Sequence, residues 1–335
     1  MLDRDDILII DGLQYINWTR ELYEEARDHG VNAIHVTIAY WENTKETLAN
    51  IGHWHKQFRA HADLLLHVQT ADDITRAQQQ NKLGIIFGLQ NCSPIEDDLT
   101  MVDILHRLGV RIMQLSYNNQ SLLATGCYEQ DDPGITRFGR EVIREMNRVG
   151  MVVDMSHSAE RSTLEAMAIS ERPIAITHAN PSAFHAALRN KSSRVLEELG
   201  RSGGMLGLSL YPFHLKHGSD CTLESFCQMV ADTVELMGSE HVGIGSDLCQ
   251  NWGYQTLAWM RSGRWAADID HGEGSAADPA WPAQPTWFQN NQHFGNLING
   301  LGEVGFNAEE IRRIMGGNWL RFFASSFDAM DTQNT

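Results

Sequence analysis

The sequence predicts an α/β fold, a (β/α)8 TIM barrel, and two observations predict it. Short apolar, β-branched runs recur about eight times along the 335 residues, and amphipathic segments with helical periodicity separate them. Each run ends in a polar or glycine-rich turn, as buried parallel strands do. The count of eight favours a closed barrel over a doubly wound sheet.

The expected elements follow in chain order. We expect strands at 7–10, 33–38, 84–89, 112–115, 151–154, 174–177, 205–209 and 242–245. A helix is predicted over 136–150, where apolar residues recur at helical spacing and Gly150 offers a C-cap. A last helix is predicted from Asn307, a suitable N-cap followed by acidic residues.

The stretch from about 248 to 293 breaks this rhythm, because five tryptophans lie there among glycine, proline and aspartate. These are Trp252, Trp259, Trp265, Trp281 and Trp287. The stretch follows the eighth strand, so barrel geometry would place it over the C-terminal mouth as a lid or a dimer contact. We therefore expect one barrel domain over 1–335 and leave a homodimer open.

Composition narrows the classes of partner. The chain has 26 basic and 43 acidic residues, a formal charge of −17, which repels nucleic acid and anionic membranes. Its apolar runs fall short of the roughly 20 residues that span a bilayer, and its acidic start is unlike a secretory signal. Five cysteines without CxxC spacing suit reduced thiols. We expect a cytoplasmic protein with a small-molecule substrate.

Three polar residues stand at the ends of predicted strands, where barrel enzymes place their chemistry. They are His157, His178 and Asp247. Two imidazoles and a carboxylate suffice to hold a catalytic divalent metal and to leave a position open for water. A single histidine is more simply a structural one, but all three at strand ends favour a metal site.

Seven segments together resemble the membrane (renal) dipeptidase family of zinc peptidases, within the amidohydrolase-like superfamily. The resemblance covers nearly the whole chain. It rests on IIDG, GIIFGLQN, TRFGREVIREMNRVGMVVDMSHS, PIAITHANPSAF, RNKSS, HVGIGSD and GGNWLRFF. It implies a barrel of the metallo-dependent hydrolase type with a two-zinc site at its mouth.

The family pattern is only partly kept. In the family, the first strand ends in a His-x-Asp pair that binds one zinc, and these places fall on Leu13 and Tyr15. The bridging glutamate falls on Gln90, which has a carbonyl oxygen but no charge. Neither Leu13 nor Tyr15 is an ordinary metal ligand. The resemblance is therefore to a divergent member that lacks one ligand set.

The other ligand set is kept. The two histidines of the second zinc match His157 and His178, and the aspartate after the eighth strand matches Asp247. A histidine that assists the tetrahedral intermediate falls on Tyr117, which we assign with Asp247 to catalysis. Arg189 resembles the anchor of a substrate carboxylate.

Charge arithmetic favours one ion. Two divalent ions need several carboxylates for compensation, and this site keeps only Asp247. One ion on His157 and His178, completed by Asp247 or by the Gln90 oxygen, balances better. Asp247 is then a ligand or a general base. Zinc is the expected ion, and a site without metal is the alternative.

The leading hypothesis is a dipeptidase-like hydrolase of an amide or related C–N bond in a small carboxylate-bearing substrate. A dipeptide, an N-acyl amino acid or an N-methylated amino acid fits, held by Arg189 with Tyr15, Gln90 and Tyr211 around it. The alternative is a catalytically silent barrel that binds an amino-acid-like ligand, and a third option is a deaminase-like or lyase enzyme. Aromatic residues after the early strands suit packing or, as the alternative, a quaternary ammonium.

Overall fold

Nine parallel strands form one sheet whose ends meet. The computed structural model describes residues 7–262 and 282–328. In these residues β1, β2, β4, β5, β6, β7, β8 and β9 close a barrel, because β9 pairs back onto β1. The strands are β1 Ile9–Gln14, β2 Val31–Ala39, β3 Leu65–Val68, β4 Leu83–Leu89, β5 Val110–Gln114, β6 Val152–Asp154, β7 Ala175–Ile176, β8 Met205–Leu208 and β9 Val242–Ile244.

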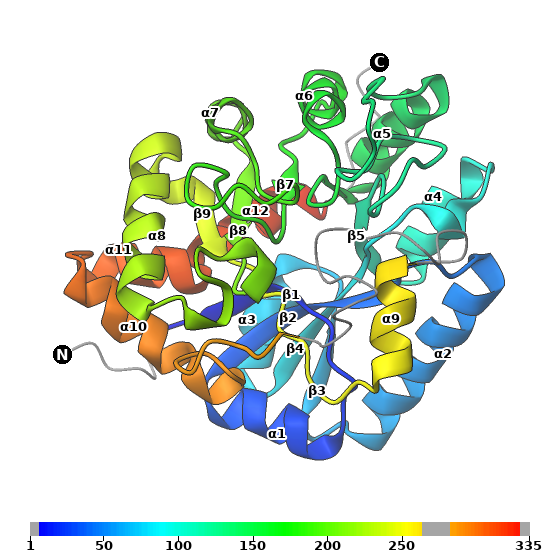
Figure 1. The fold of residues 1–335 in the computed structure, drawn as a ribbon. Helices are drawn as coiled ribbons and strands as arrows, with labels where there is room; N and C mark the ends of the chain where they lie inside the picture. The colour runs from blue at the N-terminus through cyan, green and yellow to red at the C-terminus, as the bar shows by residue number, and fades with distance from the viewer. Residues whose placement is uncertain (1–6, 263–281, 329–335) are drawn as a thin grey trace.

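Helices surround the strands, and the barrel opens toward the viewer in Figure 1. The α-helices are α1 Arg20–Asp28, α2 Thr44–Ala60, α3 Ala71–Gln79, α4 Thr100–Arg107, α5 Arg137–Val149, α6 Glu160–Ile169, α7 Ser193–Arg201, α8 Leu223–Met237, α9 Tyr254–Ser262, α10 Phe294–Glu303, α11 Ala308–Arg312 and α12 Asn318–Ser326. Among the described residues, no helix combines the length and apolar character that a bilayer crossing requires.

The predicted barrel is confirmed; most strand ends differ from the prediction by one or two residues, and two differences are larger. β1 starts two residues later than predicted and continues to Gln14. The polar side chains of Asp11 and Gln14 can be buried in this strand because Gln14 Nε2 donates a hydrogen bond to Asp11 Oδ2 at 2.7 Å. The strand β3 was not predicted. It is short and pairs with the first half of β4, while β5 pairs with the second half of the same edge.

The predicted helix over 136–150 is confirmed as α5. Thr136 caps its start by accepting a hydrogen bond from the amide of Gly139, and Gly150 ends it with a left-handed φ of 83°. Asn307 is the N-cap of α11, as predicted. The last helix is not continuous, because a π-helical turn, η7 Arg313–Gly317, separates α11 from α12. Gly316 lies there against the carbonyl of Leu8, where a Cβ would be only 2.4 Å from the oxygen.

Two apolar layers hold the barrel together. The larger lies between the strands and the outer helices. The smaller fills the barrel interior, where Ile10, Ile86 and Ile112 meet aromatic residues of α12, above all Trp319. Trp319 is fully buried and its indole N–H donates to the carbonyl of Ile244 at 2.9 Å. The apolar side chains of this inner layer stabilise the barrel by being buried. The polar residues gather at the carboxyl ends of the strands, where barrel enzymes have their active sites.

Candidate active site at the barrel mouth

A cavity enclosing about 360 Å³, part of it open to solvent, lies at the carboxyl ends of the strands. Its walls contain seven of the predicted site residues: Tyr15, Gln90, Tyr117, His157, Arg189, Tyr211 and Asp247. The eighth, His178, is buried directly behind His157. The structure therefore brings the predicted residues together, while the roles assigned to them stay predictions.

Four further residues line the cavity. Tyr40 follows β2 and is one of the aromatic residues after the early strands that were expected to border the pocket. The other three were not predicted: His214 lies in the short 3-10 helix η3 Pro212–His214, and Met260 and Arg261 belong to α9. The sequence gives little sign of these three, because none of them follows a strand directly.

The two histidines face each other through their Nε2 atoms, which lie 3.0 Å apart. Each ring has another partner at Nδ1: Asn118 Oδ1 lies 2.7 Å from His157 Nδ1, and Thr177 Oγ1 lies 2.8 Å from His178 Nδ1. The Thr177 hydroxyl donates its proton to Asp154 Oδ2 at 2.6 Å, so it can only accept from His178.

These contacts assign the proton of both neutral rings to Nδ1, leaving a lone pair on each Nε2. Burial lowers the pKa of His157 and of His178 well below the ordinary value, and the positive charge of Arg189 lowers both further. Two neutral imidazoles thus direct lone pairs at one point. Hydrogen bonding of the far ring nitrogen in this way is typical of metal-ligating histidines.

A third acceptor points to the same place. Gln90 Oε1 lies 3.1 Å from His157 Nε2, and the amide is oriented because its Nε2 donates to Thr37 Oγ1 at 2.8 Å. Converging acceptors without a donor between them repel each other unless a cation or a proton lies among them. The donor set of two imidazoles and one carbonyl oxygen fits one divalent ion.

Acidic ligands are scarce at this point. Within residues 7–262 and 282–328, no three side chains of histidine, cysteine, aspartate or glutamate gather closely enough to hold a metal ion. Asp247 lines the same cavity, and its role as ligand or base stays a prediction. Its φ is +57°, a left-handed value that aspartate tolerates better than most residues, and it turns the chain sharply after β9.

Arg189 is 1% exposed and lies under the histidines. Its Nη1 donates to the carbonyl of Ser156, and its Nη2 donates to the carbonyl of His178 at 3.4 Å. A buried guanidinium carries a full positive charge, so this side of the cavity favours an anionic group. Arg261 adds a second positive charge to the cavity wall.

Tyr117 connects the two sides of the cavity. Its ring stacks on His157 with centroids 4.1 Å apart, and it meets Trp41 edge to face at 5.1 Å and Tyr40 at 6.1 Å. Offset stacking of this kind fixes the ring orientation. The phenol therefore has one defined position beside the imidazole.

The β1 side carries Leu13 and Tyr15, the positions at which the resemblance predicts that a ligand pair is lost. Leu13 is fully buried, and Tyr15 is 8% exposed in the cavity wall. Burial raises the pKa of Tyr15, so the phenol stays neutral. Asp11, beneath them, accepts hydrogen bonds from the amide and hydroxyl of Ser246, and burial raises its pKa to about 6.

Part of the tryptophan-rich stretch is placed next to the cavity. The indole of Trp252 donates to the carbonyl of Tyr15 at 2.9 Å, and the indole of Trp41 donates to the carbonyl of Met260 at 3.1 Å. Trp287 lies elsewhere, bonded to the carbonyl of Cys221. Trp265 and Trp281 lie outside the described residues. The single domain over 1–335 and the cover formed by 248–293 therefore stay predictions.

Comparisons with known proteins bear on the family and the fold. A family model described as membrane dipeptidase, peptidase family M19, matches residues 16–253. The dipeptidase tcpJ of Claviceps purpurea is 23% identical over 292 residues, covering 86% of this chain and 62% of its own length. The chain thus spans less than two thirds of that curated relative.

Solved structures share the fold. An amidohydrolase from Pseudomonas aeruginosa superposes with a TM-score of 0.90 at 33% identity, covering 97% of this chain and 98% of its own. The dipeptidase AC, a metallo peptidase of family M19, has a TM-score of 0.80 at 18% identity and covers 96% of this chain and 99% of its own.

Proposed function

The chain belongs to the membrane dipeptidase family, peptidase family M19, and on that premise we propose that it is a dipeptidase-like hydrolase with one divalent ion. The substrate class is a small carboxylate-bearing amide, a dipeptide or an N-acyl amino acid, whose nitrogen can also carry a methyl group. In the reaction the C–N bond breaks, water adds its hydroxyl to the acyl carbon, and the leaving nitrogen takes the proton.

One observation carries the proposal. His157 Nε2 and His178 Nε2, each with a lone pair, lie 3.0 Å apart, and Gln90 Oε1 lies 3.1 Å from His157 Nε2. The low pKa of both imidazoles disfavours a proton among these acceptors. A cation is the remaining way to relieve their repulsion.

His157, His178 and the Gln90 oxygen would hold the ion, with Asp247 as a fourth ligand or as the base. Zinc is the ion we propose, since imidazole suits it. When bound, such an ion polarises the scissile carbonyl and lowers the pKa of a coordinated water. Charge limits the site to one ion, because Leu13 and Tyr15 supply no compensating carboxylate.

The remaining roles fall on side chains of the cavity wall. Arg189 attracts the substrate carboxylate through its charge. Asp247 takes a proton from the attacking water and passes it to the leaving nitrogen. The Tyr117 hydroxyl donates a hydrogen bond to the developing oxyanion, in the place of the histidine that the family pattern has. Tyr15 and Tyr211 confine the substrate between them.

The experiment combines metal analysis with a substrate panel. Purified protein is analysed for zinc, iron and manganese by mass spectrometry, then assayed with dipeptides, N-acyl amino acids and N-methylated amino acids with and without added metal. We expect about one ion per chain and hydrolysis that a chelator abolishes. Protein without stoichiometric metal, whose His157→Ala variant binds ligand unchanged, would contradict the hydrolase.

The second candidate is a silent barrel that binds an amino-acid-like ligand. The replacement of ionisable ligands by Leu13, Tyr15 and Gln90 favours it, because these changes remove the charges of a two-metal centre. Saturable binding of amino acids without turnover of any panel member would support it. A cytoplasmic location and a homodimer are further proposals, which fractionation and light scattering test.

A further inference from the structure

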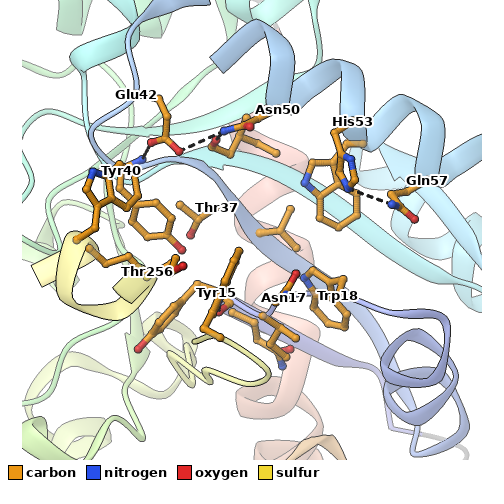
Figure 2. Close-up of a pocket in the computed structure, with 18 of the residues that line it drawn as sticks. Tyr15, Asn17, Trp18, Thr37, Tyr40, Glu42, Asn50, His53, Gln57 and Thr256 are labelled. Carbon is orange, nitrogen blue, oxygen red and sulfur yellow. Dashed lines mark hydrogen bonds between the residues drawn. The ribbon is translucent and has the colours of Figure 1, made fainter. Parts of the chain in front are cut away.

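A second pocket opens beside the reaction cavity and encloses about 880 Å³, part of it open to solvent. It lies between the end of β1, the strand β2 and the helices α2 and α9. Figure 2 shows Tyr15 and Trp18 on one side, Asn50, His53 and Gln57 of α2 opposite them, and Tyr40 with Glu42 at one end. Tyr15, Tyr40 and Met260 line both hollows, so the side pocket adjoins the cavity.

The lining of the side pocket is aromatic and acidic. Seven tyrosines and tryptophans contribute to it: Tyr15, Trp18, Tyr23, Tyr40, Trp54, Trp252 and Trp259. Glu42 is the one carboxylate among its described lining residues, and neither lysine nor arginine is among them. Aromatic faces and a carboxylate are the groups that attract an organic cation.

The Glu42 carboxylate is held in place. It accepts hydrogen bonds from the amides of Tyr40 at 2.6 Å and Trp41 at 3.0 Å, and from Asn50 Nδ2 at 3.2 Å. Bonds of this kind position the carboxylate without neutralising its charge, because amides are uncharged donors. The negative charge is therefore fixed at the end of the pocket near the cavity wall.

Another acceptor in the wall lacks a partner. The side chain of Gln14 is fully buried and lines the pocket, and its Oε1 has no hydrogen-bond partner among the described residues. Its Nε2 is already used, since it donates to Asp11 Oδ2 and to Asn291 Oδ1. Both polar atoms of the Gln14 side chain lie beneath the pocket surface, so this part of the wall offers neither a positive charge nor a free donor to an anion.

Adjacent hollows of opposite charge suggest one extended ligand. The cavity is lined by two arginines, Arg189 and Arg261, against one carboxylate, Asp247, whereas the side pocket holds Glu42 without a lysine or arginine among its described lining residues. We propose that the side pocket binds an alkylammonium group of a ligand whose carboxylate lies in the cavity. The substrate class is then a dipeptide or an N-acyl amino acid that has a free carboxylate and a cationic alkyl chain. The reacting bond and the carboxylate position in the cavity rest on the proposed function.

A metal ion suits the pocket less well, because one carboxylate provides too few anionic oxygens for Ca²⁺ or Mg²⁺. An alkylammonium needs no coordination shell, since its methylene or methyl groups contact aromatic rings while its charge faces Glu42. Both primary and methylated ammonium groups satisfy this chemistry.

The test uses ligands that contain no amide bond, so binding is measured without turnover. The probes are 6-aminohexanoate, its trimethylammonium analogue and hexanoate. Four tryptophans line the pocket, Trp18, Trp54, Trp252 and Trp259, and their fluorescence reports occupancy. We expect the two cationic probes to bind about tenfold more tightly than hexanoate.

Variants localise the effect. Glu42→Gln keeps an acceptor oxygen for the amides and should reduce the preference to about twofold. Thr256 of α9 also lines the side pocket. Thr256→Lys adds a positive charge to this wall and should abolish the preference for cationic probes, whereas Thr256→Gln, which adds bulk without charge, should keep it. Glu235→Gln, an exposed change on α8, removes the same charge elsewhere and should leave the preference intact.

The outcomes separate the two proposals. Equal binding of hexanoate and the cationic probes, or no binding of either, overturns the inference even if dipeptides are hydrolysed. An unchanged preference in Glu42→Gln and Thr256→Lys overturns it as well. A preference that both variants remove supports it, even in a protein that hydrolyses nothing.

Discussion

Opposite sides of one cavity have been built with different chemistry. On the β6–β7 side, His157 and His178 are buried, neutral and oriented by hydrogen bonds, and their lone pairs converge. On the β1–β2 side, Leu13 is buried and Tyr15 meets Tyr40 edge to face at 6.5 Å. The first side is arranged for a cation, and the second for apolar and aromatic contacts.

If the site holds one ion, as proposed, the difference shows how a two-ion pattern can change into a one-ion pattern. Removing ligands from one side leaves space, and a bulky aromatic side chain with a neutral hydroxyl can fill it without an uncompensated charge. The other side keeps its geometry because its hydrogen bonds do not depend on the lost ligands. Thr177 and Asp154, for example, orient His178 from within the β6–β7 side.

The largest effect on metal content and activity is expected when a proposed metal ligand is removed. His157→Ala should lower the metal content to a small fraction of one ion per chain and reduce kcat/KM about 10³-fold or more. His185→Ala serves as the control, because His185 lies outside the cavity lining. Metal analysis and steady-state kinetics measure both. Full metal content in His157→Ala would break the contrast between the two sides.

A smaller effect is expected where the sides meet. Tyr117→Phe keeps the stacked ring on His157 but deletes the hydroxyl, which should reduce kcat about 100-fold with KM nearly unchanged. Tyr254→Phe, at a residue 56% exposed, should change neither. If KM rises and kcat stays the same, Tyr117 binds substrate and does not act on the oxyanion.

Charge restoration sharpens the comparison further. Gln90→Glu adds a carboxylate beside His157 and should tighten metal binding about tenfold, measured by competition with a chelator. Gln78→Glu, exposed on α3, is the matched control. Adding Leu13→His and Tyr15→Asp should then raise the metal content toward two ions. A content that stays at one ion would show that backbone geometry, and not ligand identity, sets the stoichiometry.

The smallest effect concerns stability on the β1 side. The pKa of Asp11 is about 6 in the folded chain, above its ordinary 3.8, so burying the carboxylate is costly above pH 6. That cost falls as the pH drops through 6 toward 3.8, because the folded state takes up a proton first. When the pH is lowered from 7.5 to 5, the free energy of unfolding of the protein should rise by about 1–2 kcal/mol relative to that of Asp11→Asn.

Urea denaturation at several pH values measures this difference. Asp72→Asn, an exposed change on α3, corrects for general charge effects. A difference between the protein and Asp11→Asn that does not vary with pH would show that Asp11 does not titrate in this range. The hydrogen bonds from Ser246 would then dominate over burial.

The sequence predicted most of the fold, because a strand buried on both faces leaves a nearly continuous apolar run. It missed β3, which has only four residues, two of them partly exposed, and which pairs only with half of β4. The extent of β1 was also missed, since Asp11 and Gln14 read as a turn until their mutual hydrogen bond is known.

For the site, residues directly after strands could be found, and residues brought in by helices could not. His157, His178 and Asp247 follow strands, so their position alone suggested a common location. Met260 and Arg261 reach the cavity because α9 packs there, which depends on long-range contacts that periodicity does not record. The opposite charge of the two hollows likewise became apparent only from their lining residues.

Trp319 has a consequence for the order of assembly. Its ring lies against Gly12 of β1, Gly207 of β8 and Gly243 of β9, where added Cβ atoms would come within 2.7 to 3.0 Å of the indole. The first strand and the last two strands of the barrel therefore pack against one aromatic side chain, Trp319, which follows all of them in the sequence. During synthesis on the ribosome, the barrel interior stays unfilled until α12 has emerged. We expect chains interrupted before Trp319 to be held by chaperones or degraded, and not to accumulate as partly active enzyme.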